Sequence, residues 1–562
     1  MESIKRDFKR IYYNKAYLLL LALTAACSYG FKIVHPVMGI DDTPYAYYFE
    51  EGLAAVVGRW VLFVLNKVLS LSDFAPFLTD FAAVLILMMA VTLWGLLFYS
   101  VLGERIPRYG YWFFSCIFLS CPLIAEVFTY FLHNGIAIGY LCCGISLYAL
   151  GEAYSELEKK RMRGFAGRIA LAVLFMTVAM GCYESFMIVW LAGVVLLLLS
   201  ERIVGGSKGV FLKLGTAAAT AACGMVLRSI VLHLVIAAFD LSYLQDAAVQ
   251  RSVGEMLGWI FEPGAAAEFA MILKRLFVMY GVFGYAYYPI KIFVLASAVM
   301  VLYSLWRTVR QKDLWILILQ AGSFIAAFLL AVVEGKATLY RSAQFLPLFC
   351  GFGILMGACA LQGFVGKVRT GQGKRKLRRF LAGSATGLYL LCGAVILWNQ
   401  CTDLNHWFYV DYRKYEYSRE YMSRVANELE KNFDTSKPIV FTGEWENPKG
   451  LVKDAYVSLK SDTFYKMKAI TDLVDDQLLE KFYRDYGVWV AQTPSLSVIS
   501  WGKYAFDTDA ELVRFMNFHG HKFRPLSDSS LYEEAELYAR DLPSFPREGS
   551  IVDRGSYIIV HF

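Results

Sequence analysis

The sequence has little charge for its length. Only 18% of its 562 residues are Asp, Glu, Lys or Arg, whereas 57% are hydrophobic. A soluble chain of this size would be about a quarter charged. The composition therefore excludes an ordinary soluble globular protein and favours a polytopic membrane protein.

Several motifs that mark common functions are absent. The last 161 residues contain no cysteine, which excludes a disulfide framework or a Cys-ligated metal site there. The chain also lacks a P-loop, a glycine-rich dinucleotide fingerprint, a His-Glu-x-x-His motif and a Cys-x-x-Cys motif. Without a nucleotide-binding signature, a substrate used by this protein should be activated in another form.

Basic and acidic residues are divided unequally along the chain. Residues 401–562 contain 20 Lys or Arg and 26 Asp or Glu, whereas the first 400 residues contain 35 basic and 22 acidic groups. A basic apolar part followed by a mildly acidic tail indicates two regions with different surroundings. Nucleic-acid binding is not indicated, because the excess of basic residues is confined to the apolar part.

Apolar stretches of the length needed to cross a bilayer recur along the first 400 residues. About twenty apolar residues are required for one crossing. This measure predicts about eleven transmembrane helices, and the pair around 169–200 is short enough to be one broken hairpin. The expected helices lie near 17–34, 76–102, 110–126, 130–150, 169–182, 186–200, 214–238, 281–306, 313–333, 342–364 and 381–398.

Loop charges predict the orientation. Alternate loops, beginning with residues 1–16, contain about 25 Lys or Arg, whereas the intervening short loops contain about eight. An excess of basic residues marks the cytoplasmic side. We therefore expect a multi-pass protein of the bacterial plasma membrane, with a cytoplasmic N-terminus and everything after about residue 399 outside.

The tail has the pattern of a folded domain. Residues 411–433 have helical spacing, the segment KPIVFTGEW reads as a buried strand ending at a glycine turn, and GSYIIVHF reads as a closing strand. The expected organisation is a multi-span domain over 1–399 and an extracytoplasmic α/β domain over 400–562.

Unusual polar residues fall on the outer side of this topology. Asp41 and Asp42 follow the first helix directly, where Pro36 and Gly39 constrain the backbone, whereas Glu50 and Glu51 are interpreted as solvated loop residues. Arg228 is an intramembrane cation, which is costly unless it is paired or functional. The other outer-side candidates are Arg59, Glu126, His133, Tyr183, Glu184, Ser185, His233, Glu334, Lys336, Tyr340 and Arg341.

Short motifs in this outer set resemble a known family. The segments IDD, GRW, YES and YRS, in that order after the first helix, resemble the bacterial type II glucosyltransferases of O-antigen conversion, which belong to the GT-C class of polytopic glycosyltransferases. The family usually has YQS where this chain has YES at Tyr183–Ser185. The likeness covers the membrane part and, loosely, the start of the tail.

The resemblance implies a donor sugar, expected to be glucose, carried on a polyprenyl phosphate, and a cell-surface polysaccharide or glycolipid acceptor. It places the catalytic acid in the first outside loop, at Asp41 or Asp42. A carboxylate there would take the proton of the attacking hydroxyl with inversion, and a divalent cation between the two aspartates is also compatible. Arg341, Lys336 and Arg228 would hold the donor phosphate. The expected substrate-binding residues are Arg59, Tyr183, Glu184, Tyr340 and His133.

Other functions stay open at this stage. A secondary transporter or flippase for lipid-linked sugars would also need many spans and buried charge, although no internal repeat is evident. A non-catalytic surface-assembly protein whose working part is the tail is a further alternative. Among glycosyltransferases, transfer of mannose or arabinose, or of an oligosaccharide to protein, is not excluded.

Overall fold

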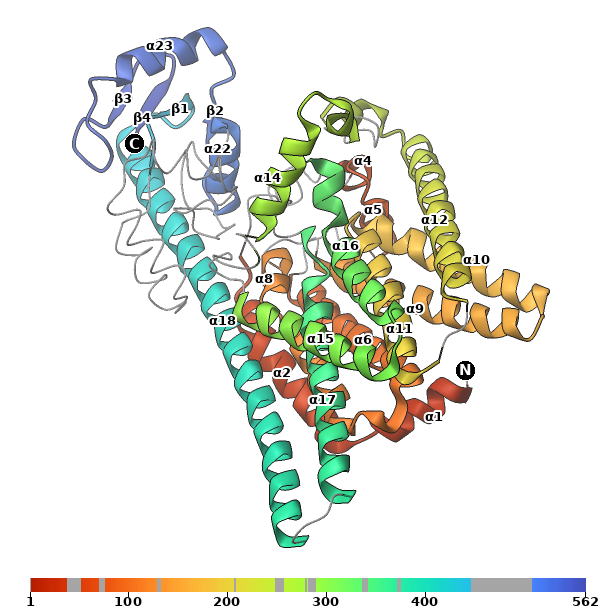
Figure 1. The fold of residues 1–562 in the computed structure, drawn as a ribbon. Helices are drawn as coiled ribbons and strands as arrows, with labels where there is room; N and C mark the ends of the chain where they lie inside the picture. Colours follow the sequence, from red (N-terminus) through yellow and green to blue (C-terminus); the bar gives the residue numbers. More distant parts are fainter. Residues whose placement is uncertain are drawn as a thin grey trace.

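The computed structural model describes residues 2–37, 52–69, 76–128, 133–206, 209–247, 257–277, 280, 290–335, 342–370, 375–445 and 508–562. Figure 1 shows a bundle of helices joined by one long helix to a small sheet. The helices are α1 Glu2–Ile11, α2 Lys15–Val34, α4 Gly52–Val56, α5 Trp60–Leu69, α6 Pro76–Leu102, η3 Gly103–Arg105, α7 Arg108–Leu119, α8 Leu123–Phe128, α9 His133–Glu158, α10 Met162–Cys182, α11 Phe186–Val204, α12 Val210–Ala238, η4 Ser242–Ala247, η5 Gly258–Phe261, α14 Ala265–Phe277, α15 Ile290–Gln311, α16 Trp315–Glu334, α17 Leu346–Thr370, α18 Arg375–Asn432, α22 Asp509–Phe518 and α23 Ser529–Ala539. The strands are β1 Pro438–Thr442, β2 Arg524–Pro525, β3 Ile551–Asp553 and β4 Ile558–His561.

The described part of the chain contains ten helices that are long and apolar enough to cross a membrane. The prediction of a polytopic helical membrane protein is confirmed. The expected span at 110–126 is instead formed by two shorter helices, α7 and α8, which are separated at Ser120–Pro122. Proline lacks the amide hydrogen that a helix interior requires, which explains the break.

The broken segment nevertheless runs alongside α2. The indole N–H of Trp112 in α7 donates to the carbonyl oxygen of Ile11, 3.0 Å away, just before α2 begins. At the far end of α2, the hydroxyl of Tyr29 donates to the carbonyl oxygen of Leu119 over 2.6 Å. The uncertain pair at 169–200 is resolved as two separate helices, α10 and α11, of 21 and 19 residues.

Polar groups inside the bundle have partners on neighbouring helices. The indole N–H of Trp94 in α6 donates to the carbonyl oxygen of Tyr140 in α9 over 3.0 Å. The hydroxyl of Tyr140 donates to the side-chain oxygen of Gln344 over 2.7 Å. These three side chains are fully buried, and an unmade hydrogen bond would be costly where no water is available. The contacts therefore fix how α6, α9 and the start of α17 pack.

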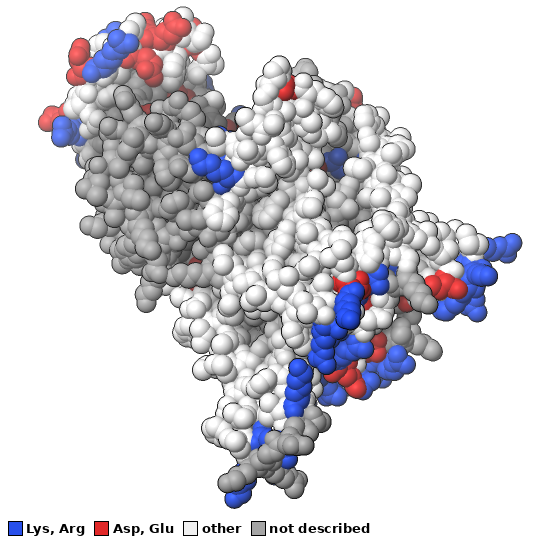
Figure 2. All heavy atoms as spheres, viewed as in Figure 1, with Lys and Arg blue, Asp and Glu red and all other residues white. Residues whose placement is uncertain are grey.

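Basic side chains gather at one end of the bundle, which we call the basic end. Arg105 donates to the carbonyl oxygen of Val204 over 2.7 Å, Arg307 donates to that of Ile203, and Lys213 pairs with Glu201 over 2.8 Å. These contacts bring together the turn after α6, the last turns of α11 and α15 and the first turn of α12. On the face shown in Figure 2, Lys and Arg cluster at this end while the middle of the bundle carries almost no charge.

One continuous helix connects the bundle to the tail. Helix α18 spans 58 residues from Arg375 to Asn432, so the expected boundary between residues 399 and 400 lies inside it. The predicted helix at 411–433 is its last part. The predicted strands are also confirmed as β1 and β4.

The tail strands form a four-stranded sheet in the order β2-β1-β4-β3. Strand β1 pairs in parallel with both β2 and β4, and β3 pairs antiparallel to β4. A turn at Gly443, with φ +78°, follows β1. Helices α22 and α23 contact this sheet, and an apolar cluster that includes Val425, Phe441 and Val560 joins it to the end of α18.

Candidate functional site

The end of the bundle away from the basic end carries a polar cluster built from three separate chain segments. The turn between α4 and α5 contributes Arg59, the turn between α10 and α11 contributes Tyr183 and Glu184, and α12 contributes Arg228. All four residues were predicted from the sequence as outer-side site residues. The structure brings them into direct contact.

A glycine turn presents Arg59 to this cluster. Helix α4 ends in a Schellman motif, in which the amide of Gly58 donates to the carbonyl of Ala55 and that of Arg59 donates to the carbonyl of Ala54, both over 2.8 Å. Gly58 has φ +90°, in the left-handed region that disfavours other residues. The turn leads Arg59 away from the axis of α4.

Arg228 connects the three segments. Its Nη2 donates to Oε1 of Glu184 over 2.6 Å and to the carbonyl oxygen of Gly58 over 3.3 Å. Its Nε donates to the carbonyl oxygen of Met180, at 3.3 Å, near the end of α10. Because a cation within a membrane helix is costly alone, these acceptors explain how α12 can carry it.

The ion pair lies directly on Gly58. A Cβ atom at this position would lie 2.3 Å from Nη2 of Arg228 and 2.5 Å from Oε1 of Glu184. No side chain larger than hydrogen fits without moving the pair. The close approach and the positive φ are therefore two independent reasons for glycine at residue 58.

Arg59 is placed differently from Arg228. Its guanidinium carbon lies 4.9 Å from the centre of the Tyr183 ring, in a cation–π contact. Its Nε is buried and has no hydrogen-bond partner among the described residues. No described carboxylate pairs with Arg59, whereas Arg228 is already neutralised by Glu184. Of the two cations, Arg59 is therefore the one that has no carboxylate partner among the described residues.

Two further buried polar atoms adjoin this cluster without a hydrogen-bond partner in the described ranges. They are Oγ of Ser185, a residue only 2% exposed, and Nε1 of Trp60. The Trp60 ring packs against Gly181, where a Cβ would come within 2.4 Å of Nε1. Trp60 follows Arg59 in the motif GRW, and Ser185 follows Glu184 in the motif YES.

Other predicted site residues cannot be placed. Asp41, Asp42, Lys336, Tyr340 and Arg341 lie outside the described residues. His133 is the first residue of α9, and its side chain also lies outside what the structure describes. The structure therefore does not test the catalytic pair or two of the three expected phosphate-binding cations. It describes Arg228 as the partner of Glu184.

The described residues on either side of the Asp41–Asp42 segment are anchored. Val37 is 2% exposed and belongs to the apolar cluster of the tail, with Tyr415 and Met422 of α18. On the other side, α4 packs against η4 and α12, and a Cβ on Gly52 would lie 2.8 Å from Leu241. Val37 thus lies at the tail, and α4 lies beside the helix that carries Arg228.

A buried carboxylate of the apolar bundle was not among the residues predicted from the sequence. Asp80, in the first turns of α6, is 1% exposed although it lies within an apolar span. An acid inside a membrane helix is a functional-site signal in itself, and the motif LTDFAA carried that signal. Separately, no group of three or more side chains that could hold a metal ion occurs in the described ranges.

In the described part of the chain, ten long apolar helices with a partly buried arginine cluster at one end define a multi-pass α-helical membrane protein. The model of the GtrII glucosyl transferase family matches residues 30–357, more than half of the chain, and the chain belongs to this family. Membership implies that the protein is a glucosyltransferase and therefore an enzyme. No curated protein and no solved structure matches the chain.

The family match covers the whole described cluster. Gly58, Arg59, Glu184 and Arg228 fall within residues 30–357, as do Asp41 and Asp42, whereas the tail lies beyond the match. The part of the chain that carries the family likeness is therefore the part that builds the cluster.

Proposed function

We propose that this glucosyltransferase moves glucose from a polyprenyl-phosphate donor to a cell-surface polysaccharide or glycolipid at the outer face of the bacterial plasma membrane. The observation that carries the proposal is the cluster of Arg59, Tyr183, Glu184 and Arg228 within the family-matched residues. This cluster offers a site for a phosphate at the membrane surface, where the head of a lipid-linked donor would lie.

The proposed sidedness rests on the charge distribution. Cytoplasmic loops are enriched in Lys and Arg, so the basic end would face the cytoplasm and the Arg59 cluster the outside. The described chain shows no nucleotide-binding fold on the basic end. A donor already attached to a lipid phosphate fits a reaction on the side of the membrane where nucleotide sugars are absent.

The proposed chemistry is a GT-C-type displacement. Asp42 or Asp41 takes the proton from the acceptor hydroxyl as that oxygen bonds to the anomeric carbon of the glucose. The bond from this carbon to the phosphate oxygen breaks at the opposite face, which inverts the centre. The polyprenyl phosphate leaves with additional negative charge.

The leaving phosphate needs cations fixed in a setting with little water. We assign this role first to Arg59, because Glu184 already neutralises Arg228. Arg228 then acts as a positioning residue that holds Gly58, and through it Arg59, against α10. Lys336 and Arg341 remain proposed partners of the same phosphate, with Tyr340 and His133 as substrate contacts. A cation at Asp41 and Asp42 is compatible but not required.

The tail is proposed to hold the acceptor. Its apolar cluster includes Val37, which lies four residues before Asp41 in the chain. An acceptor glycan bound by the tail would therefore be delivered close to the segment that carries the proposed base.

The proposal is tested with membrane vesicles of both orientations that contain the full chain. Radiolabelled polyprenyl-phosphate glucose and UDP-glucose are supplied separately with cell-envelope acceptor, and labelled acceptor is counted. We expect transfer only from the lipid donor and only at the outer face. Direct use of UDP-glucose would overturn the donor assignment. Net movement of the labelled lipid across the bilayer without glycosidic transfer would favour the flippase alternative.

A further inference from the structure

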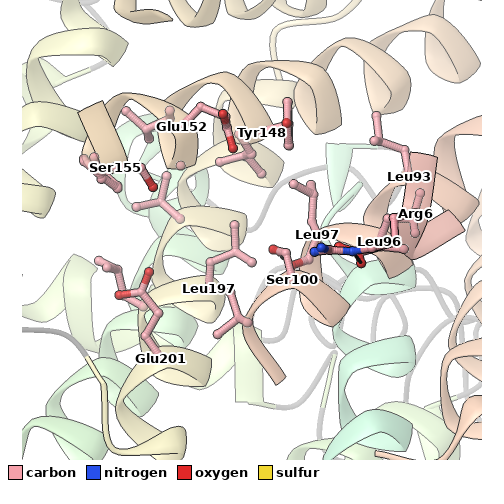
Figure 3. A pocket seen from close by; sticks show the side chains of 18 residues that line it. Arg6, Leu93, Leu96, Leu97, Ser100, Tyr148, Glu152, Ser155, Leu197 and Glu201 are labelled. Atoms are coloured by element: carbon pink, nitrogen blue, oxygen red, sulfur yellow. Dashed lines mark hydrogen bonds and ion pairs between the residues drawn. The ribbon is translucent and has the colours of Figure 1, made fainter. Parts of the chain in front are cut away.

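A cavity lies at the basic end, away from the Arg59 cluster. Its volume is about 390 Å³, within the range of small-ligand sites. Figure 3 shows side chains of α1, α6, α9 and α11 around this open space. None of the lining residues belongs to the site already described.

The lining changes from apolar to polar along all three long helices. Helices α6, α9 and α11 all end at the basic end, because Arg105 follows α6 and contacts Val204, and Tyr154 and Glu201 both contact Lys213. Further from that end the cavity is lined by Leu93, Leu147 and Val194. About two turns nearer to it, the corresponding residues are Ser100, Ser155 and Glu201.

A cavity with an apolar interior and a polar mouth is typical of a binding site for an amphiphile. A lipid of the leaflet at the basic end would have its head group at the polar mouth and its hydrocarbon pointing toward the bilayer centre. The leucine-lined depth matches hydrocarbon, and the mouth offers hydroxyl, carboxylate and guanidinium groups. Both the direction and the chemistry of the cavity therefore agree with a membrane lipid as occupant.

The charged side chains at the polar mouth of the cavity indicate which lipid head group would bind there. Glu201 is neutralised by Lys213 at 2.8 Å, and Asp7 lies 3.5 Å from Nε of Arg6. Glu152 lines the same mouth and has no ion-pair partner among the residues that the structure describes. Glu152 can therefore bind a cationic group. Among the described residues Arg6 contacts Asp7 through Nε, and because its side chain is 77% exposed its remaining N–H groups can bind a phosphate.

We propose that this cavity binds an amine-bearing phospholipid, with its ammonium group at Glu152 and its phosphate near Arg6. A lipid that carries only negative charge fits less well, because its head group would lie against an unpaired carboxylate. The cavity is thus distinct in chemistry from a polyprenyl-phosphate site. The inference does not depend on the proposed function.

The test is native mass spectrometry of the full chain taken from nanodiscs with equal amounts of phosphatidylethanolamine and phosphatidylglycerol. We expect one retained phosphatidylethanolamine per chain, at about a tenfold excess over phosphatidylglycerol. Leu197→Trp, which fills the cavity from α11, should abolish retention. The matched control is Leu174→Trp on the exposed surface of α10, which should retain the lipid.

A second variant separates head-group recognition from folding. Glu152→Gln keeps the size of the side chain but removes its charge, and it should lower the phosphatidylethanolamine excess toward one without emptying the cavity. Equal retention by the wild type and Leu197→Trp would overturn the proposal. So would a preference for phosphatidylglycerol, or a head-group ratio that Glu152→Gln leaves unchanged.

Discussion

Arg228 of α12 and Glu184 of the turn between α10 and α11 form an ion pair 2.6 Å long, and the pair lies against the backbone of Gly58. This relationship joins the turn before Arg59 to the turn that carries Tyr183. It explains how residues that lie far apart in the sequence form one polar cluster.

Replacing Gly58 by alanine should disrupt the cluster. The new methyl group would meet both partners of the ion pair, and the left-handed backbone costs a further ~1 kcal/mol. We expect glucosyl transfer to fall by at least about tenfold, since 1.4 kcal/mol corresponds to a factor of ten. Gly103→Ala is the matched control, because Gly103 has φ +57° but nothing within 4 Å of its Cβ. Equal losses in both variants would contradict a specific role of the contact.

The Arg228–Glu184 pair should show a measurable coupling energy. Because the two side chains are 22% and 48% exposed, we expect only about 1 kcal/mol in a double-mutant cycle of Arg228→Met and Glu184→Ala. The readout is kcat/KM for transfer. Glu184→Gln should keep most of the activity, since an amide oxygen still accepts from Nη2. Strictly additive effects of the two single substitutions would show that the pair does not act as a unit.

Substitution of Arg59 should raise the KM for the donor more than substitution of Arg228 does. Arg59→Lys retains the charge but loses the planar group over Tyr183, so we expect a raised KM for the donor. Tyr183→Phe should be nearly neutral, whereas Tyr183→Leu should cost about 1 kcal/mol through loss of the ring. The KM for the acceptor serves as the internal control. A rise in acceptor KM alone would place Arg59 on the other substrate.

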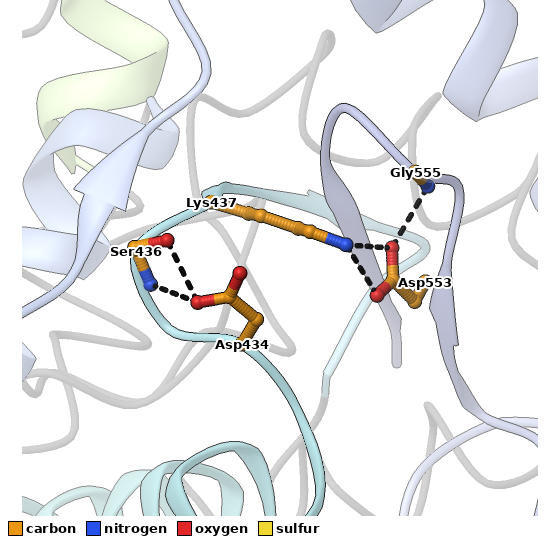
Figure 4. A network of polar contacts seen from close by, with 5 residues as sticks. All are labelled: Asp434, Ser436, Lys437, Asp553 and Gly555. Atoms are coloured by element: carbon orange, nitrogen blue, oxygen red, sulfur yellow. Dashed lines mark hydrogen bonds and ion pairs between the residues drawn. The ribbon is translucent and has the colours of Figure 1, made fainter.

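A surface ion pair in the tail predicts a pH dependence. Lys437 donates to both carboxylate oxygens of Asp553, over 2.9 and 2.6 Å, and the amide of Gly555 donates to the same carboxylate (Figure 4). These donors lower the pKa of Asp553 below its ordinary value, the hydrogen bond from Lys437 being the larger cause. A lowered folded-state pKa stabilises the fold above the unfolded-state pKa, and the contribution is lost as the pH falls through the folded-state pKa.

We therefore expect Asp553→Asn to destabilise the tail at pH 7, and by less as the salt concentration rises. Its difference from the wild type should disappear once the pH falls below the lowered folded-state pKa of Asp553. The measurement is the urea midpoint of tail unfolding in the full chain, followed by pulse proteolysis. Glu533→Gln on α23 removes an exposed carboxylate that has no ion-pair partner in the described chain, and it should leave the midpoint unchanged. A deficit of Asp553→Asn that persists at low pH would contradict the assignment.

Hydropathy and loop charge predicted most helices of the bundle, because crossing a bilayer demands a long apolar run. The single helix predicted at 110–126 was wrong, because Pro122 divides this apolar run into α7 and α8. The change from apolar to charged composition near residue 399 suggested a domain boundary. A helix can cross such a change without a break, and α18 does so.

The sequence predicted which residues form the Arg59 cluster, but not which of them contact one another. Sidedness placed Arg59, Glu184 and Arg228 on one face, yet it could not say which cation Glu184 would neutralise. That outcome depends on the Schellman turn at Gly58 and on how α12 packs against α10. Arg228, which was predicted to hold the donor phosphate, pairs with Glu184, whereas no described carboxylate pairs with Arg59; the phosphate contact itself stays a prediction. Asp80 was overlooked because the apolar residues around it dominated its span.

The central claim is tested most directly by the initial rate of glucose transfer from radiolabelled polyprenyl-phosphate glucose in proteoliposomes of the full chain. The variants are Asp41→Asn/Asp42→Asn and, as a control for loop charge, Glu50→Gln/Glu51→Gln. The account predicts a fall of at least about a hundredfold for the aspartate variant, as expected for removal of a general base, with donor binding retained and the control close to wild type. Full transfer by the aspartate variant would contradict it.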